Sequence, residues 1–573
     1  MDIKHKLAAV GAGAVLLAAG VAVPALSAPA ATDRTETLVA SSSPVTTVVE
    51  SVVRVRVPLP ASVGPHPAAC DWLSYLRFRH ANGPARSADA DRILVAQPGI
   101  LEGAGAFDSV ARNTVAEAAR HGDHIEFWAL DRRSNCLEDH TGRLAGLAAR
   151  DTHLAVDYYY RNRSVGGHTF AGFHDNADLG WLGRVGLEQT LRDQYDLLLA
   201  ELPDPALRRQ KVLCGGHSLG GILTGFFAVW DFDGNHATTA DAGYQQCGGY
   251  FALDTSISTS LDDLTGGMPV ENPGLNFLAT QAALETGLLT RSLSLPVLIN
   301  AETMNLLGIA GLNAAVAPAA ESDLARYVPS NLNVDTTQRI LFAKDLLTFL
   351  AGTPTTKDFR LTNSAALGAL LDDHSQPLAF LETSVGFFDG GPIVDKDFPL
   401  PHELKAVPGL EGLTAQLGVE PMAVPDQPNG PLYNWRNYNR IGAPDDPVYK
   451  RRNGEPFTNA GKEVTDIQEL ARSLAEHPLD FTEHYFPTKL STDLFQSEAP
   501  QVSRDAVHEI GLTANPTIRL LAGDSFTDPP GTASTETIVM PGYQHLDVLT
   551  AAPRQNNGRP EQVSVNLARF AIS

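Results

Sequence analysis

The stretch KVLCGGHSLGGIL, residues 211–223, constrains the fold of this chain more than any other segment. Its first apolar residues have the length of a buried strand, and the apolar residues after the glycines are typical of a helix. Gly216 and Gly220 flank Ser218 at the junction, where a tight strand-to-helix turn leaves no room for side chains. We therefore expect strained backbone angles at Ser218, and a hydroxyl held at a helix N-terminus that favours negative charge.

Segments of strand length alternate with helical patterns on both sides of this turn. Strands are expected at 52–57, 92–97, 125–130, 211–215, 250–253, 516–522 and 536–540. Helices are expected at 110–121, 219–230 and 562–570. This alternation predicts an α/β fold with a mostly parallel central sheet that is covered by helices on both faces.

The regular alternation is lost between about residues 255 and 510. Helical patterns at 336–350 and 463–474 stand there among loops rich in proline, glycine and asparagine. We interpret this part as a large, mainly helical cap or lid insertion, because the closing strands are too few to fold alone. The expected division is a signal peptide at 1–30, the first part of the core at 31–255, the cap at 256–510 and the last part of the core at 511–573.

The N-terminus has the pattern of an export signal. Charged and polar residues at 2–6 precede an apolar run at 7–23, and small residues with an Ala-Pro-Ala site at 28–30 follow. No later segment is long and apolar enough to span a bilayer. We expect a secreted protein without stable membrane insertion once the signal is cleaved.

Composition indicates a globular protein and argues against two classes of partner. The chain of 573 residues is 43% hydrophobic and 19% charged, which is the range of soluble globular proteins. Its formal net charge of -23 argues against nucleic acid and anionic membranes as partners, because an acidic surface repels phosphate. The sequence does not indicate an oligomeric state.

Four cysteines can form two disulfides in an oxidising compartment, and three pairings are open. If Cys214 and Cys247 lie on neighbouring strands, the expected scheme is Cys214 with Cys247 and Cys70 with Cys136. Buried free thiols are the alternative, since cysteine packs as a small apolar residue. The chain has no C-x-x-C spacing, so no zinc site is expected.

The segment GGHSLGG, between a strand and a helix, resembles the nucleophile elbow of the α/β-hydrolase superfamily, particularly its serine lipases and carboxylesterases. The resemblance covers roughly residues 48–255 and 511–573. It implies that Ser218 is a nucleophile and that no cofactor or metal takes part. The base in this superfamily is a histidine after the last strand, and His545 fits because it follows the 536–540 strand and a loop glycine. His217, beside the nucleophile, is expected to be structural.

The acid that orients His545 has several candidates. The superfamily places it after the strand that precedes the histidine strand, where the segment GDSFTDP offers Asp528 and Asp524. Asp528 before proline is the first choice, although this loop is two residues longer than the usual pattern. Asp254, at the end of the strand after the nucleophile helix, is a position that some lipases use. Glu302, after the strand-like run PVLIN, is a fourth alternative.

The oxyanion hole is expected to combine the backbone N–H of Leu219 with one from the loop after Gln97. Ile100 is the expected second donor, and Leu101 is the alternative. Pro98 stands where relatives often carry histidine, which changes the loop geometry.

These features together predict a secreted serine hydrolase that cleaves carboxylic esters through an acyl-enzyme. By analogy with lidded lipases, the large insertion suggests a hydrophobic acyl ester or lipid as substrate. Two alternatives remain: a secreted peptidase or amidase with the same triad, and a binding protein on a hydrolase fold whose triad has decayed.

Overall fold

The computed structural model describes residues 33–261, 273–294, 299–400, 417–418, 420–525 and 535–573. The expected signal peptide lies outside these residues. Within them, no helix has the length and apolar character needed to cross a membrane.

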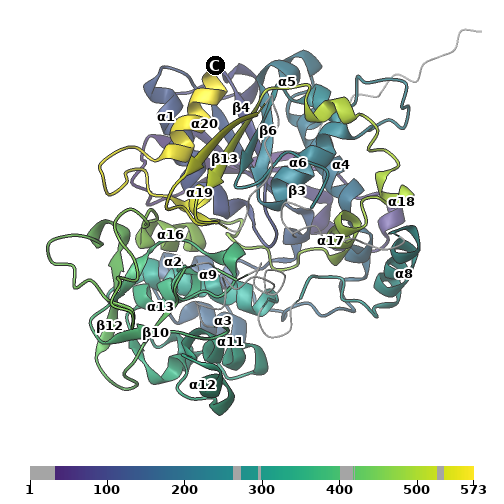
Figure 1. The fold of residues 1–573 in the computed structure, drawn as a ribbon. Helices are drawn as coiled ribbons and strands as arrows, with labels where there is room; N and C mark the ends of the chain where they lie inside the picture. Colours follow the sequence, from purple (N-terminus) through teal and green to yellow (C-terminus); the bar gives the residue numbers. More distant parts are fainter. Residues whose placement is uncertain (1–32, 262–272, 295–298, 401–416, 419, 526–534) are drawn as a thin grey trace, which may run out of the picture.

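A nine-stranded sheet forms the centre of the molecule, in the order β1-β2-β3-β5-β4-β6-β7-β13-β14 (Figure 1). The strands from β1 to β5 in this order pair antiparallel, and those from β5 to β14 pair parallel. Their bounds are β1 (Arg34–Val39), β2 (Val48–Arg56), β3 (Trp72–His80), β4 (Ile93–Gln97), β5 (Glu126–Asp131), β6 (Val212–His217), β7 (Gly249–Leu253), β13 (Thr517–Ala522) and β14 (Thr535–Met540).

The central parallel strands are mainly apolar and buried because helices cover both faces of the sheet. The residues of β4 from Ile93 to Ala96 are fully buried. Helices α1 (Asp108–Arg120) and α20 (Gln562–Ile572) pack into one apolar cluster. Helices α4 (Leu187–Glu201) and α6 (Leu219–Val229) pack into the other (Figure 1). The prediction of a mostly parallel α/β sheet is therefore confirmed.

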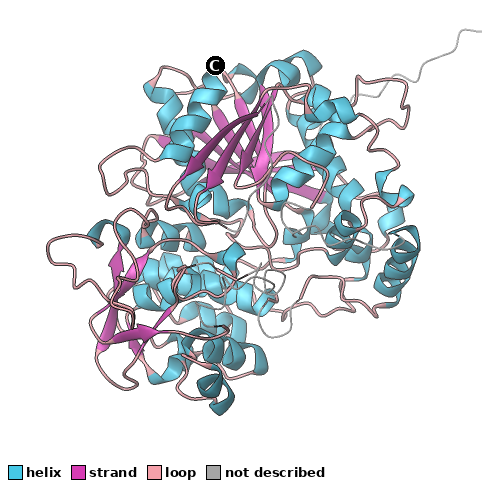
Figure 2. Cartoon of the chain, in the orientation of Figure 1, coloured by secondary structure: helices cyan, strands magenta, loops and turns pink. Residues whose placement is uncertain are grey.

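The described residues between β7 and β13 contribute no strand to this sheet. Its described part is mainly helical, with two small sheets of short strands (Figure 2). The strands are β8 (Arg360–Leu361), β9 (Gly386–Asp389), β10 (Ile393–Asp395), β11 (Ala423–Pro425) and β12 (Leu432–Asn437). The helices are α8 (Pro273–Thr286), α9 (Ala301–Val316), α10 (Leu324–Tyr327), α11 (Leu332–Phe342), α12 (Leu346–Ala351), α13 (Asn363–Leu371), α16 (Ile467–Ala475), α17 (Thr488–Phe495) and α18 (Pro500–Ser503).

Two helices that precede the nucleophile strand in sequence join the helices of this segment. They are α2 (Thr141–Ala149) and α3 (Leu154–Tyr160), and α2 packs against α9 and α16 (Figure 1). Gly146 permits close packing there, because a Cβ at this position would lie 2.8 Å from Leu312 on α9. The helices around α9 are thus assembled from segments on both sides of β6.

One predicted helix is wrong in extent. The single helix expected at 336–350 is two helices, α11 and α12, with a break at Ala343 and Lys344. The break follows from capping, because the side chain of Asp345 accepts a hydrogen bond from the N–H of Thr348 and begins α12. The helix expected at 463–474 begins later, at Ile467, where Asp466 caps it in the same way.

The two predicted disulfides are present, Cys70 with Cys136 and Cys214 with Cys247. Cys214 lies in β6, and Cys247 comes just before the neighbouring strand β7. Adjacent strands bring these two residues together, as the sequence analysis expected. Both bridges fit a protein of an oxidising, extracellular compartment.

Candidate active site

The serine turn has the strained backbone that the glycine pattern predicts. Ser218 has φ 52° and ψ -120°, between the end of β6 and the start of α6. A Cβ at Gly216 would lie 2.4 Å from the carbonyl oxygen of Gln97, and one at Gly220 only 2.0 Å from the same atom. No side chain fits at either position, so the glycines allow the turn to pass against the end of β4.

His545 forms a hydrogen-bonded pair with Asp254. The distance from His545 Nδ1 to Asp254 Oδ2 is 2.6 Å. The carboxylate of Asp254 also accepts hydrogen bonds from the N–H of Ala522, at 2.9 Å, and from the hydroxyl of Ser525, at 2.6 Å. An acceptor surrounded by donors holds a histidine with its proton on Nδ1, which puts the basic lone pair on Nε2.

The nucleophile turn and this pair lie at the same edge of the sheet. The N–H of Ser218 donates to the carbonyl of Leu253, at 3.1 Å, and Asp254 is the next residue. On the other side of Ser218, the ring of His217 lies 4.4 Å from that of His545 between centroids. The fold thus brings residues 218, 254 and 545 together from three distant parts of the sequence.

Two of the other acidic candidates, Asp524 and Glu302, contact other side chains. Asp524 is 3.5 Å from the ammonium group of Lys462. Glu302 accepts hydrogen bonds from the side chains of Asn331 and Asn333, at 2.6 and 3.0 Å. Asp528, the first choice from the sequence, lies outside the described residues.

A second buried pair next to His545 was not found by sequence reasoning. His217 Nδ1 lies 2.6 Å from Glu102 Oε1, and its Nε2 lies 3.0 Å from the backbone carbonyl of His545. Two acceptors, one on each ring nitrogen, favour the doubly protonated imidazolium. His217 itself was expected to be structural, but nothing in the sequence pattern points to Glu102, which follows β4 by five residues.

The Glu102–His217 pair affects the pKa of both His217 and His545. Burial lowers the pKa of His217, but the carboxylate of Glu102 outweighs burial, and the resulting pKa is raised. Burial and the positive charge of His217 lower the pKa of His545, against the opposing effect of Asp254. His545 is therefore neutral at neutral pH and able to accept a proton.

The loop after β4 is held in place by charged groups. Arg132 donates hydrogen bonds to the carbonyls of Pro98 and Gly99, and Glu102 accepts from the N–H of Gly99 at 2.6 Å. The N–H groups of Ile100 and Leu101 have no acceptor among the described residues.

The helix α6 supplies the other expected donor of an oxyanion hole. Leu219 is its first residue, and the N–H groups of a first turn have no acceptor inside the helix. Both predicted donors therefore have N–H groups available. The structure leaves the choice between Ile100 and Leu101 open, and Leu101 has a positive φ of 60°.

The inserted segment reaches the site and supports the histidine loop. The carbonyl of Glu382 accepts a hydrogen bond from the N–H of Leu546, at 3.0 Å. The hydroxyls of Thr383 and Ser384 each donate to the carboxylate of Asp547 at 2.7 Å. Burial raises the pKa of Asp547, and these hydrogen bonds partly offset that effect. The resulting pKa is about 7.

Apolar side chains from both parts of the chain join the cluster that contains Leu219, the residue after the serine. Leu378 and Phe380 of the inserted segment pack against the apolar cluster that contains Leu101 and Leu219. Ser218 itself is only 4% exposed. The serine is therefore buried, and Leu219 beside it belongs to an apolar cluster to which both parts of the chain contribute.

Groups of histidine and acidic side chains close enough to hold a cation occur among the described residues. They are Glu50 with Asp108 and His477, Glu138 with His140 and Asp480, Asp372 with Asp373 and His374, and Asp231 with Asp233 and Asp241. An arginine already bonds the carboxylates of the first two groups. None of the groups contains Ser218, Asp254 or His545.

The sheet order and the turn identify the fold. Eight strands, β2-β3-β5-β4-β6-β7-β13-β14, include one antiparallel end, and the serine follows the central strand β6 at a strained turn before a helix. The chain has the α/β-hydrolase fold. Its inserted segment separates β7 from β13, so the last two strands and α20 complete a sheet begun more than 250 residues earlier.

The solved structures that are similar to this chain include two proteins from Saccharomyces cerevisiae. The chain is 12% identical to the peroxisomal α/β-hydrolase Lpx1, with a TM-score of 0.31, over 94% of this chain and 89% of that one. It is 10% identical to a soluble variant of monoglyceride lipase, with a TM-score of 0.27, over 87% of this chain and 91% of that one. No family model and no curated protein sequence matches the chain.

The Gly220→Ala substitution should destabilise the protein. The new methyl group would meet the carbonyl of Gln97, a backbone atom that cannot rotate away, so we expect a loss of about 1–3 kcal/mol in the free energy of unfolding. Denaturant unfolding measures this loss. Gly180→Ala is the matched control, because a Cβ there has no atom within 4 Å. An equal effect of the two substitutions would contradict the steric account.

Proposed function

We propose that this protein is a secreted serine hydrolase that cleaves carboxylic esters through an acyl-enzyme. The observation that carries the proposal is the strained Ser218, at the N-terminus of α6 and beside a buried His545–Asp254 pair. Strain of this kind persists only where the surrounding structure enforces it, and it gathers at functional sites. The two disulfides support the extracellular part of the proposal.

In this mechanism His545 Nε2 takes the hydroxyl proton of Ser218 while the serine oxygen attacks the ester carbonyl carbon. The resulting oxyanion accepts hydrogen bonds from the N–H of Leu219 and from that of Ile100 or Leu101. His545 then gives its proton to the leaving alcohol as the C–O bond breaks. Water attacks the acyl-enzyme by the same route, and the acid leaves. Asp254 stabilises the imidazolium that forms twice in each cycle.

We infer that the acyl group is hydrophobic. Leu378 and Phe380 from the inserted segment pack against the same apolar cluster as Leu101 and Leu219 from the core, and Leu219 directly follows Ser218. Burying methylene groups against such a surface contributes about 0.8 kcal/mol for each group. An ester with a short, polar acyl group would gain little there.

Ser218→Ala is the direct test of the proposal. The variant should fold normally, lose reaction with a fluorophosphonate probe, and lose hydrolysis of nitrophenyl esters by a factor on the order of 10⁴ or more. A panel of nitrophenyl esters from acetate to laurate, measured on the wild type, should show kcat/KM rising with chain length. Wild-type protein that neither reacts with the probe nor hydrolyses any ester or aminoacyl amide would instead indicate a binding protein.

Asp254→Asn should separate the acid candidates. Asparagine keeps the shape but cannot hold His545 in the required tautomer or stabilise its charge, so kcat should fall on the order of 10³–10⁴-fold. Asp524→Asn, a change of the same kind next to Lys462, should change kcat less than about threefold. If Asp528→Asn has the large effect and Asp254→Asn does not, our assignment of the acid is wrong.

The pH dependence of kcat/KM should reflect the lowered pKa of His545. Because the base must be neutral, activity falls as pH drops through that pKa, so the acid limb should lie below pH 6.5. Glu102→Gln keeps a hydrogen-bond acceptor for Gly99 but removes the charge that keeps His217 protonated. A neutral His217 no longer lowers the pKa of His545, and the acid limb should move to higher pH. Glu455→Gln, at an exposed position, should leave the profile unchanged; the same shift in both variants would refute the coupling.

A further inference from the structure

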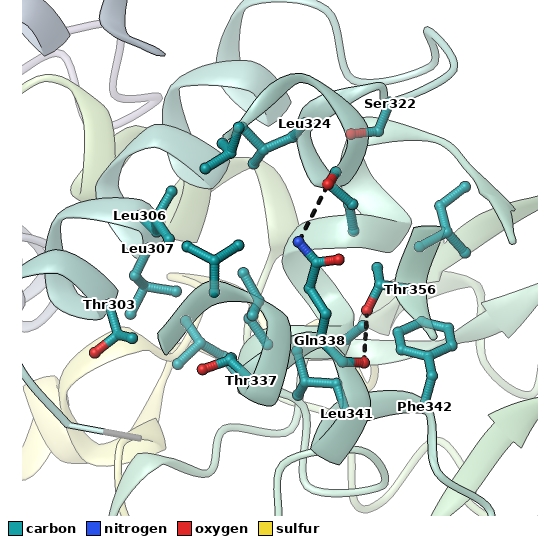
Figure 3. Close-up of a pocket in the computed structure, with 18 of the residues that line it drawn as sticks. Thr303, Leu306, Leu307, Ser322, Leu324, Thr337, Gln338, Leu341, Phe342 and Thr356 are labelled. Carbon is teal, nitrogen blue, oxygen red and sulfur yellow. Dashed lines mark hydrogen bonds between the residues drawn. The ribbon is translucent and has the colours of Figure 1, made fainter. Parts of the chain in front are cut away.

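A cavity of about 150 Å³ lies inside the inserted segment, between helices α9, α10, α11 and α13 (Figure 3). Its wall is mainly apolar and includes Leu307, Leu324, Leu341 and Phe342. No residue of the candidate active site lines it. Apolar cavities of this volume take up molecules the size of benzene, so the space suits roughly six or seven non-hydrogen atoms.

One buried polar atom in this wall has no partner. The side chain of Gln338, on α11, is 8% exposed, and its Nε2 donates a hydrogen bond to the carbonyl of Ala325 at 3.1 Å (Figure 3). Its Oε1 has no hydrogen-bond partner among the described residues. The carbonyl of Ala325 accepts only, so it fixes the amide with nitrogen toward it and leaves Oε1 as a buried acceptor. A buried acceptor is stabilised by any donor that reaches it.

We propose that this cavity is a binding site for a small aliphatic alcohol. The hydroxyl donates to Gln338 Oε1, and the alkyl chain packs against the leucine and phenylalanine side chains. A carboxylate is a poor match, because its oxygens repel the amide oxygen and have no proton to donate at neutral pH. Arg326 at the wall does not alter this, because its guanidinium already donates to the carbonyls of Lys357 and Ser322, at 3.0 and 3.4 Å.

The site is independent of the proposed hydrolase activity, so the test uses the Ser218→Ala protein. Titration calorimetry compares 1-hexanol with methyl pentyl ether, which has the same number of heavy atoms but no hydroxyl hydrogen, and with hexanoate. We expect 1-hexanol to bind about three- to tenfold more tightly than the ether, the difference typical of one hydrogen bond. Hexanoate should bind more weakly than both.

Substitutions in the wall locate the bound molecule. Gln338→Leu should remove the preference for 1-hexanol over the ether while leaving ether binding intact. Ala369→Phe fills the cavity and should abolish binding of both, and thermal unfolding checks that each variant folds. The matched control is Gln281→Leu on α8, a glutamine that does not line the cavity, and it should bind both ligands like the parent protein.

Three results would overturn the proposal. The first is equal binding of alcohol and ether by the parent protein, since an ordered water would then satisfy Gln338. The second is the absence of binding, or binding that both wall variants leave unchanged. The third is loss of hexanol binding when Ser218 of the wild type is labelled by a fluorophosphonate, which would make the cavity part of the active site.

Discussion

The contact between the nucleophile turn and the end of strand β4 is the constraint on which the site depends. The carbonyl of Gln97 lies so close to Gly216 and Gly220 that neither position accepts a Cβ. Ser218 has a positive φ at this turn, immediately before α6. The loop at 98–102 follows Gln97 directly, so the same contact joins the serine turn to the loop that we propose as the source of the second oxyanion donor.

Around that turn, buried acidic side chains are paired with histidines. Two carboxylate–imidazole pairs lie there, Glu102 with His217 and Asp254 with His545. The centroids of the two histidine rings are 4.4 Å apart. All four are buried, and in a medium of low dielectric such contacts act more strongly than in water. The ring of His217 joins Glu102 in the loop after β4 to the backbone of His545, and its positive charge adds to burial in lowering the pKa of His545. These four residues hold the ring of His545, the proposed base, and the loop after β4, and none of them is exposed.

The inserted segment has two structural roles. Its stretch from Gln376 to Ser384 lies against the alcohol-sized cavity on one side, where Leu381 forms part of the wall. On the other side, Thr383 and Ser384 hold Asp547 in the loop that carries His545. One continuous piece of chain therefore lines the cavity and holds the loop that carries His545.

The sequence by itself determined the turn and the alternation of strands and helices, whereas the pairing of the cysteines depended on which strands became neighbours. The turn and the alternation follow from short-range sterics at glycine and from the periodicity of apolar residues, which a linear sequence records directly. The break between α11 and α12 escaped detection because the capping bond of Asp345 outweighs a continuous apolar pattern. Only the tertiary structure decided that Asp254 contacts His545, that Glu102 holds His217, and that Gln338 faces a cavity. Asp254 and His545 are 291 residues apart in the sequence. No local pattern specifies which of several carboxylates at strand ends a distant loop will contact.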